Sequence, residues 1–209
     1  CPPLSTLPCD QLQVALPYNL SFGSSIAGTL ADKNGVGTGF TLADTYSGTR
    51  LAADGTPSNP SLPGFEPAKL TVASGRLQVT TNKGIAWLTN NNQLNALGVK
   101  VDSRSRLTIE VTLVNPYYGT SSQQGGLWFG ASDKMYVKLV VVGNKVEMRR
   151  EVNDASSSSD QRITGAVSGI NNATVRLKLV ADPSNNSVAG FYSLNGGAEQ
   201  SLGTALSLS

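Results

Sequence analysis

Residues 123–139 read QQGGLWFGASDKMYVKL, and this stretch decides the fold of the chain. Successive side chains of a β-strand point to opposite faces of the sheet. If Leu127 and Phe129 face a core, Trp128 points outward between two glycines, which would leave bare backbone and a shallow groove beside the indole ring. The opposite phase would bury Trp128, and two-sheet cores often hold a tryptophan. We predict the outward phase.

The strand that follows supports the same phase. In it Val137 and Leu139 would face the core, while Tyr136 and Lys138 would share the outer face with Trp128. The alternation therefore predicts one polar, aromatic face and one apolar face across the whole stretch.

The same strand pattern recurs along the chain. Residues 106–114 (RLTIEVTLV) and 174–180 (TVRLKLV) alternate, and the dipeptides Gly143-Asn144 and Asn195-Gly196 predict two tight hairpins. Shorter strands are predicted at 18–22, 38–42, 69–73, 76–80 and 95–99. No window of a dozen residues has a helical period. Strands at this spacing predict an all-β fold, a β-sandwich.

Two connections between these strands are long. Residues 43–67 contain four prolines and are expected to be ordered, whereas the serine-rich segment 153–164 is expected to be a mobile tip. Loops of this length in a compact domain tend to be functional or flexible.

The composition indicates a secreted β protein. The chain has 209 residues, of which 14% are charged, and its formal net charge is +2. That charge is too small to predict binding to nucleic acid or to an anionic membrane. No apolar run is long enough to insert into a bilayer. Because the first residue is Cys1 rather than Met, we expect a piece of a larger secreted or cell-surface protein.

Two further features agree with export. Cys1 and Cys9 are the only cysteines, and their close spacing predicts a disulfide loop; the alternative is that Cys1 pairs with nothing. Acceptor sequons for N-glycosylation begin at Asn19, Asn172 and Asn185. We therefore expect an N-terminal disulfide-looped segment at 1–16 and one β-sandwich domain at 17–209.

The chain contains no histidine. This absence excludes Ser-His-Asp and Cys-His hydrolases, histidine-based zinc hydrolases and histidine general bases. Any catalysis would have to use carboxylates, Tyr, Lys or Arg.

Oxygen-bearing side chains around a glycine-rich turn suggest a cation site. Asp32 and Asn34 precede the glycines of DKNGVGTGF, and Asp44 follows that segment. Calcium takes carboxylate, amide and carbonyl oxygens as ligands. These residues predict a structural Ca²⁺ site, with a plain turn capped by Asp32 as the alternative.

Several strings together resemble a known family. They are LPCDQLQVALPYNLSF, GTLADKNGVGTGFTL, NNNQLNALGV and QQGGLWFGASDKMYVKLVVV, in this order, and the resemblance covers roughly residues 8–203. The set resembles the concanavalin A-like, lectin/glucanase-type domains of secreted multidomain proteins, and the last string also resembles the C-terminal module of some β-xylosidases. The resemblance implies a jelly-roll sandwich of two antiparallel sheets, one with a concave outer face, and a role in carbohydrate binding.

The catalytic signature of the glucanases is missing. Glucanases of this type carry Glu-x-Asp-x-Glu on one strand, a motif absent from this sequence. Glu110 stands alone, and Glu147 and Glu151, flanked by Arg149 and Arg150, are interpreted as a solvated, paired edge. We therefore expect a protein that is not an enzyme.

The expected function is non-catalytic binding of a glycan or polysaccharide, including those of cell-surface glycoproteins. An aromatic face packs on a pyranose while amides and carboxylates read its hydroxyl groups. The two alternatives are a spacer or protein-binding adhesion domain without a glycan site, and a hydrolase or lyase with an unrecognised carboxylate pair. The candidate ligand-binding residues are Trp128, Tyr46, Asn90, Asn91, Gln93, Tyr118, Gln124 and Tyr136.

Overall fold

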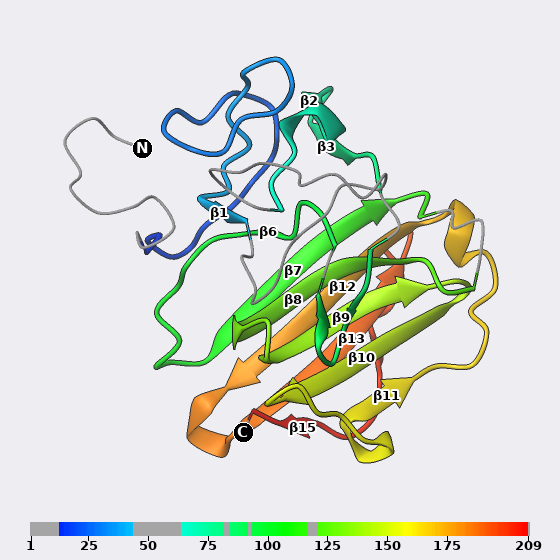
Figure 1. Cartoon of the computed structure of the whole chain (residues 1–209). Helices are drawn as coiled ribbons and strands as arrows, with labels where there is room; N and C mark the ends of the chain where they lie inside the picture. The colour runs from blue at the N-terminus through cyan, green and yellow to red at the C-terminus, as the bar shows by residue number, and fades with distance from the viewer. Residues whose placement is uncertain (1–12, 44–63, 82–83, 92, 117–120, 209) are drawn as a thin grey trace. The chain divides into compact units, whose positions relative to one another are not determined.

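The computed structural model describes residues 13–43, 64–81, 84–91, 93–116 and 121–208 (Figure 1). In these residues the chain forms antiparallel sheets and short 3-10 turns, with no α-helix. The predicted all-β class is therefore confirmed. The chain divides into two compact units, 1–102 and 103–209, which are described separately. The expected boundary between residues 16 and 17 stays a prediction.

One sheet of the second unit has four strands in the order β11-β10-β9-β8 (Figure 1). The strands are β8 (Gln124–Ser132), β9 (Met135–Val142), β10 (Lys145–Val152) and β11 (Gln161–Ile163). Each pairs with its neighbour in the sequence, so the sheet is an antiparallel meander. The turn between β9 and β10 falls at the predicted Gly143-Asn144, where Gly143 has a φ of 54°.

The other sheet of this unit has five strands. Its order is β14-β13-β12-β7, and β15 also pairs with β13. The strands are β7 (Leu107–Val114), β12 (Thr174–Asp182), β13 (Ser187–Leu194), β14 (Gln200–Ser201) and β15 (Leu206–Ser207). The predicted strands at 106–114 and 174–180 and the hairpin at Asn195-Gly196 are confirmed.

Both sheets contribute to one hydrophobic core. Leu139 and Met148 of the four-stranded sheet belong to the same buried cluster as Leu177 and Leu179 of the five-stranded sheet. An added Cβ on Gly190 of β13 would meet the Met148 sulfur at 2.9 Å, which shows how closely the two inner faces approach. Burial of aliphatic side chains at this scale is the main stabilising contribution to a β domain.

The side-chain alternation predicted for residues 123–139 is confirmed. Leu127 is buried in the shared core and Phe129 packs against it, while Trp128 is half-buried and lies outside the cluster. Val137 and Leu139 are likewise core residues. Trp128 therefore belongs to the outer face of the four-stranded sheet.

Two expectations from the sequence are wrong. Residues 18–22 form no strand, and Phe22 adopts a φ of 55°, which breaks the extended conformation. The segment 153–164 is ordered rather than mobile, because it contains the 3-10 turn η3 (Ser158–Asp160) and strand β11. The carboxylate of Asp160 accepts hydrogen bonds from the Ser157 amide and hydroxyl, which closes this turn. Most of the loop 43–67 lies outside the described residues.

Where the structure describes the first unit, its strands are short. These are β1 (Leu42–Ala43) with β6 (Leu97–Gly98), β2 (Leu70–Ala73) with β3 (Arg76–Val79), and β4 (Ala86–Trp87) with β5 (Asn90–Asn91), besides the 3-10 turn η2 (Pro67–Lys69). The strands predicted at 69–73 and 76–80 are confirmed. Of the predicted strand 38–42 only Leu42 lies in a strand, and the predicted strand 95–99 is reduced to Leu97–Gly98. Ala43, Phe65 and Leu70 form a small buried cluster.

Candidate functional site

The outer face of the four-stranded sheet carries a row of side chains aligned across the strands. Trp128 of β8 pairs with Lys138 of β9, Lys138 with Arg149 of β10, and Arg149 with Gln161 of β11. Residues that pair directly across antiparallel strands present their side chains on the same face. We call these four residues the Trp128 row; each of them is half-buried.

A second row beside it contains two buried side chains. Gly130 pairs with Tyr136, and Tyr136 pairs with Glu151. Tyr136 is 8% exposed and Glu151 is 1% exposed, and the Tyr136 hydroxyl donates a hydrogen bond to the Glu151 carboxylate at 3.2 Å. A buried carboxylate requires such partners to offset its lost hydration. The interpretation of Glu151 as part of a solvated edge is therefore wrong.

The charges around the Trp128 row are balanced. Burial lowers the pKa of Lys138, and Arg149 lowers it further, whereas the carboxylates of Glu147 and Glu151 act in the opposite direction. Gln161 donates to Glu147 at 2.8 Å, and Arg149 Nε donates to the Ser156 hydroxyl at 2.9 Å. Two cationic and two anionic side chains thus share one face of the sheet.

The spacing of these two carboxylates differs from that of a glycosidase carboxylate pair. Glu147 and Glu151 lie on the same side of β10, separated by about 13 Å along the strand at the usual rise per residue. Arg149 stands between them in the strand, and Lys138 is its cross-strand neighbour. A glycosidase carboxylate pair flanks the scissile bond at about 5–10 Å. In this protein the interval between the two carboxylates is instead occupied by cationic side chains.

The two glycines beside Trp128 serve strand pairing. A Cβ on Gly126 would overlap the carbonyl oxygen of Leu139 and lie 2.8 Å from the Val140 Cα, and a Cβ on Gly130 would lie 2.7 Å from the Tyr136 Cα. The backbone of β9 fills the space that a side chain would need. The sequence predicted that these glycines leave bare backbone and a shallow groove beside the indole ring. In the structure they instead allow the two strands to approach each other closely.

The structure brings together only part of the predicted ligand-binding set. Gln124 is exposed on β8, four residues before Trp128 on the same strand, and Tyr136 lies in the adjacent row. Asn90 and Asn91 lie on β5 in the other unit, where the Asn91 amide donates to the Leu88 carbonyl at 3.2 Å, and Gln93 is half-buried in that unit. Tyr46 and Tyr118 lie outside the described residues.

Sequence reasoning missed four members of this face as site residues. They are Lys138, Glu147, Arg149 and Gln161. Glu147, Arg149 and Glu151 recur at every second position of β10, so their alternation with Val146, Met148 and Arg150 was a signal available in the sequence.

The predicted cation residues form a turn cap. One Asp32 oxygen accepts hydrogen bonds from the amides of Asn34 at 2.8 Å and Val36 at 2.9 Å, and the other accepts from the Val72 amide at 2.8 Å. These bonds hold the pKa of Asp32 below its ordinary value, led by the bond from Val72. This geometry fits the capping alternative. Asp44 lies outside the described residues. Among the residues that the structure describes, no three acidic, histidine or cysteine side chains form a group that could hold a metal ion. The calcium site therefore stays a prediction.

Replacing Asp32 by asparagine should separate its two sets of hydrogen bonds. The amide side chain keeps one acceptor oxygen, which suits the two amides of Asn34 and Val36, and turns an NH₂ group toward the Val72 amide. We expect hydrogen exchange at Val72 to accelerate by at least about 10-fold, while Asp32→Ala accelerates exchange at all three amides. The amide of Val14, which donates to Lys100, is the internal control. Equal exchange at Val72 in wild type and Asp32→Asn would contradict the assignment.

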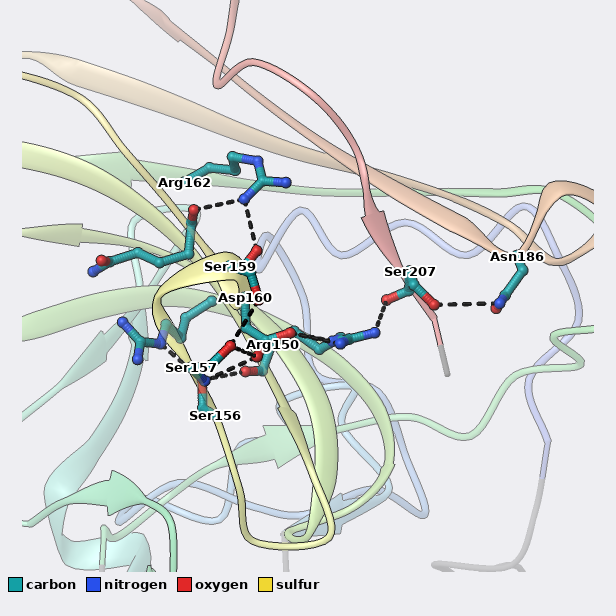
Figure 2. Close-up of polar contacts among 10 residues, drawn as sticks. Arg150, Ser156, Ser157, Ser159, Asp160, Arg162, Asn186 and Ser207 are labelled. Carbon is teal, nitrogen blue, oxygen red and sulfur yellow. Dashed lines mark hydrogen bonds and ion pairs between the residues drawn. The ribbon is translucent and has the colours of Figure 1, made fainter.

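A second polar network lies at the end of β10 and is structural (Figure 2). The guanidinium of Arg150 forms an ion pair with Asp160 at 2.6 Å and donates to the main-chain oxygen of Ser207 in β15. Arg162 donates to the main-chain oxygens of Ser159 and Thr204. These contacts join the four-stranded sheet to the C-terminal segment of the other sheet. The backbone oxygens they satisfy would otherwise need another donor.

The outer face of the five-stranded sheet is occupied by ion pairs. Arg176 pairs with Glu110, and Lys178 donates to Glu199 at 2.6 Å while its ammonium lies 4.7 Å above the Phe191 ring. The aromatic ring on this face is thus covered by a cation from its own sheet.

The remaining sequence predictions concern modification and location. Asn19, Asn172 and Asn185 are exposed, as acceptor asparagines require, and Cys1 and Cys9 lie outside the described residues. Among the described residues, no helix has the length and apolar character needed to cross a membrane. Glycosylation and the disulfide stay predictions.

Comparisons with protein-family models, with curated proteins and with solved structures gave no match to this chain.

Proposed function

We propose that this chain is a non-catalytic glycan-binding module of a secreted or cell-surface protein, and that it binds its ligand on the outer face of the four-stranded sheet. The observation that carries the proposal is the outward, half-buried Trp128 at one end of a row of polar side chains. We further propose that the two sheets belong to a jelly-roll sandwich of the concanavalin A-like type.

The chemistry of this face suits a sugar. The face of an indole ring packs against the C–H groups of a pyranose, and hydroxyl groups both donate and accept hydrogen bonds. Lys138, Arg149 and Gln161 supply donors, and Glu147 supplies acceptor oxygens. A single shallow site of this kind binds weakly, so the parent protein would gain affinity by presenting several copies.

The two alternatives are less well supported. A spacer would not need an aromatic side chain aligned with charged residues on an outer sheet face. A protein-binding domain would use the same Trp and Arg side chains as anchors, and the glycan array described below separates it from a glycan-binding module. A hydrolase or lyase would need two carboxylates flanking a substrate bond, and the interval between Glu147 and Glu151 carries Arg149.

Trp128→Ala is the direct test of the proposal. We expect binding on a glycan array and in titration calorimetry to weaken by at least about 10-fold, because an aromatic anchor supplies much of the binding free energy. Phe191→Ala, which removes an aromatic ring from the outer face of the other sheet, should leave binding unchanged. The absence of binding to any glycan, or equal affinities of wild type and Trp128→Ala, would overturn the proposal.

A further inference from the structure

We infer that the ligand is an extended, electrically neutral oligosaccharide that lies across the strands along the Trp128 row, with Trp128 at one end and Gln161 at the other. The inference rests on the proposed function and adds the orientation, the minimum length and the charge of the ligand.

The register of the sheet sets the orientation. Trp128, Lys138, Arg149 and Gln161 come from four successive strands and pair directly from one strand to the next. Neighbouring strands lie about 4.8 Å apart, so the row extends over about 14 Å perpendicular to the strands. The strand spacing is close to the length of one pyranose unit in an extended chain. A chain of three or more units can therefore place successive units beside successive strands.

The exposure of its side chains distinguishes the Trp128 row from the rows beside it. On the outer face described, the Trp128 row alone crosses all four strands without a fully buried member. The row on one side contains buried Tyr136 and Glu151, and the row on the other contains Val140, which is 7% exposed. A ligand running along the strands would have to pass over these buried positions. A ligand running across the strands meets polar groups at each step.

The charges favour a neutral ligand. Lys138 and Arg149 are direct cross-strand neighbours, an arrangement of like charges that is unfavourable in an isolated sheet. Glu147 and Glu151 flank Arg149 in its strand and offset this repulsion at Lys138. A sugar carboxylate or sulfate placed on the two cations would also face these two anionic side chains. Hydroxyl groups suit a surface on which donors and acceptors alternate.

The first experiment measures affinity against chain length and charge. The full chain is titrated with neutral gluco-, manno- and galacto-oligosaccharides of one to six units and with oligogalacturonides of the same lengths. For whichever neutral series binds, we expect the affinity to increase with chain length up to three or four units and then to level off. We also expect this affinity to change by less than about 2-fold between 50 and 500 mM salt. The acidic series should bind more weakly at every length.

The second experiment maps the two ends of the row. Gln161→Ala should weaken binding of oligosaccharides of four or more units by about 5-fold, the loss of one hydrogen bond, and leave mono- and disaccharide binding unchanged. Trp128→Ala should weaken binding at every length. Gln200→Ala, on an exposed strand of the other sheet, is the matched control.

The outcomes separate the inference from the proposed function. Failure of the wild-type chain to bind any sugar would overturn the proposed function and the inference together. Binding through Trp128 that levels off at one unit, tighter binding of the acidic series, or equal loss in Gln161→Ala at all lengths would overturn the inference and leave glycan binding standing.

Discussion

Gly126→Ala is expected to lower the free energy of unfolding by about 3 kcal/mol or more, the upper range for overpacking in a folded protein. The added methyl group would overlap the carbonyl oxygen of Leu139 and lie 2.8 Å from the Val140 Cα. Both groups belong to the backbone of β9, which is fixed on its other side by pairing with β10. Neither strand can move without breaking hydrogen bonds of the meander, so the strain cannot be relieved by a change of rotamer.

Urea denaturation of the full chain measures this effect. Gly165→Ala is the control, because a Cβ at Gly165 meets no atom within 4 Å, and its unfolding free energy should stay within about 0.5 kcal/mol of wild type. Gly130→Ala should resemble Gly126→Ala, since its Cβ would lie 2.7 Å from the Tyr136 Cα. An unfolding midpoint in Gly126→Ala equal to that of Gly165→Ala would show that the two strands are not so close.

Asp160→Asn is expected to lower the free energy of unfolding by about 2 kcal/mol, because it leaves the partly buried guanidinium of Arg150 without its counter-charge. The same carboxylate also closes the turn η3 through Ser157. A double-mutant cycle with Arg150→Met separates the ion pair from the turn, since the coupling energy reports the direct interaction. A coupling energy near zero would mean that Arg150 and Asp160 act independently.

The same carboxylate should make stability depend on pH in acid. Hydrogen bonds from Ser157, together with Arg150, hold the pKa of Asp160 below its ordinary value. A lowered pKa means that the unfolded chain binds the proton first, so the stabilisation is complete above about pH 4 and is lost as the pH falls through the lower pKa of the folded state. Asp160→Asn should lose less stability than wild type over that range.

A neighbouring ion pair that is more exposed than Arg150 and Asp160 provides the control for both measurements. Asp154 lies 3.8 Å from Lys134, whose side chain is 51% exposed. Asp154→Asn should therefore change the unfolding free energy by less than about 0.5 kcal/mol and leave the acid dependence unchanged. An equal acid dependence in Asp160→Asn and wild type would contradict the role given to Asp160.

Much of the fold was predictable because its signals are local. Alternation in 106–114 and 174–180 and the tight-turn dipeptides after Val142 and Leu194 depend only on neighbouring residues. The two-residue turn at Gly143-Asn144 also fixes the register of β9 with β10, so the pairing of Lys138 with Arg149 follows from the sequence.

The rest of the candidate site depends on a bulge that the sequence does not reveal. Ser132 pairs with Met135 at the turn, but Gly130 pairs with Tyr136, so Ala131 is an extra residue in β8. Without it, Trp128 would pair with Leu139, a core residue, and the phase of the whole strand would be reversed. The pairing of Gln161 with Arg149 was equally hidden, because it requires the Ser157–Asp160 turn that orders the serine-rich segment.

The order of strands along the chain has a consequence for how the second unit acquires its structure. The four-stranded meander lies entirely between β7 and β12, which are themselves partners in the five-stranded sheet. Its strands pair with their sequence neighbours and can form rapidly, whereas Leu107 must find Ala181 across the whole intervening sheet. During synthesis β7 therefore emerges with the hydrogen-bonding edge that β12 will occupy still unpaired, and this edge stays open until β12 has been made. This interval is the one in which the chain is most exposed to association with other unfolded chains.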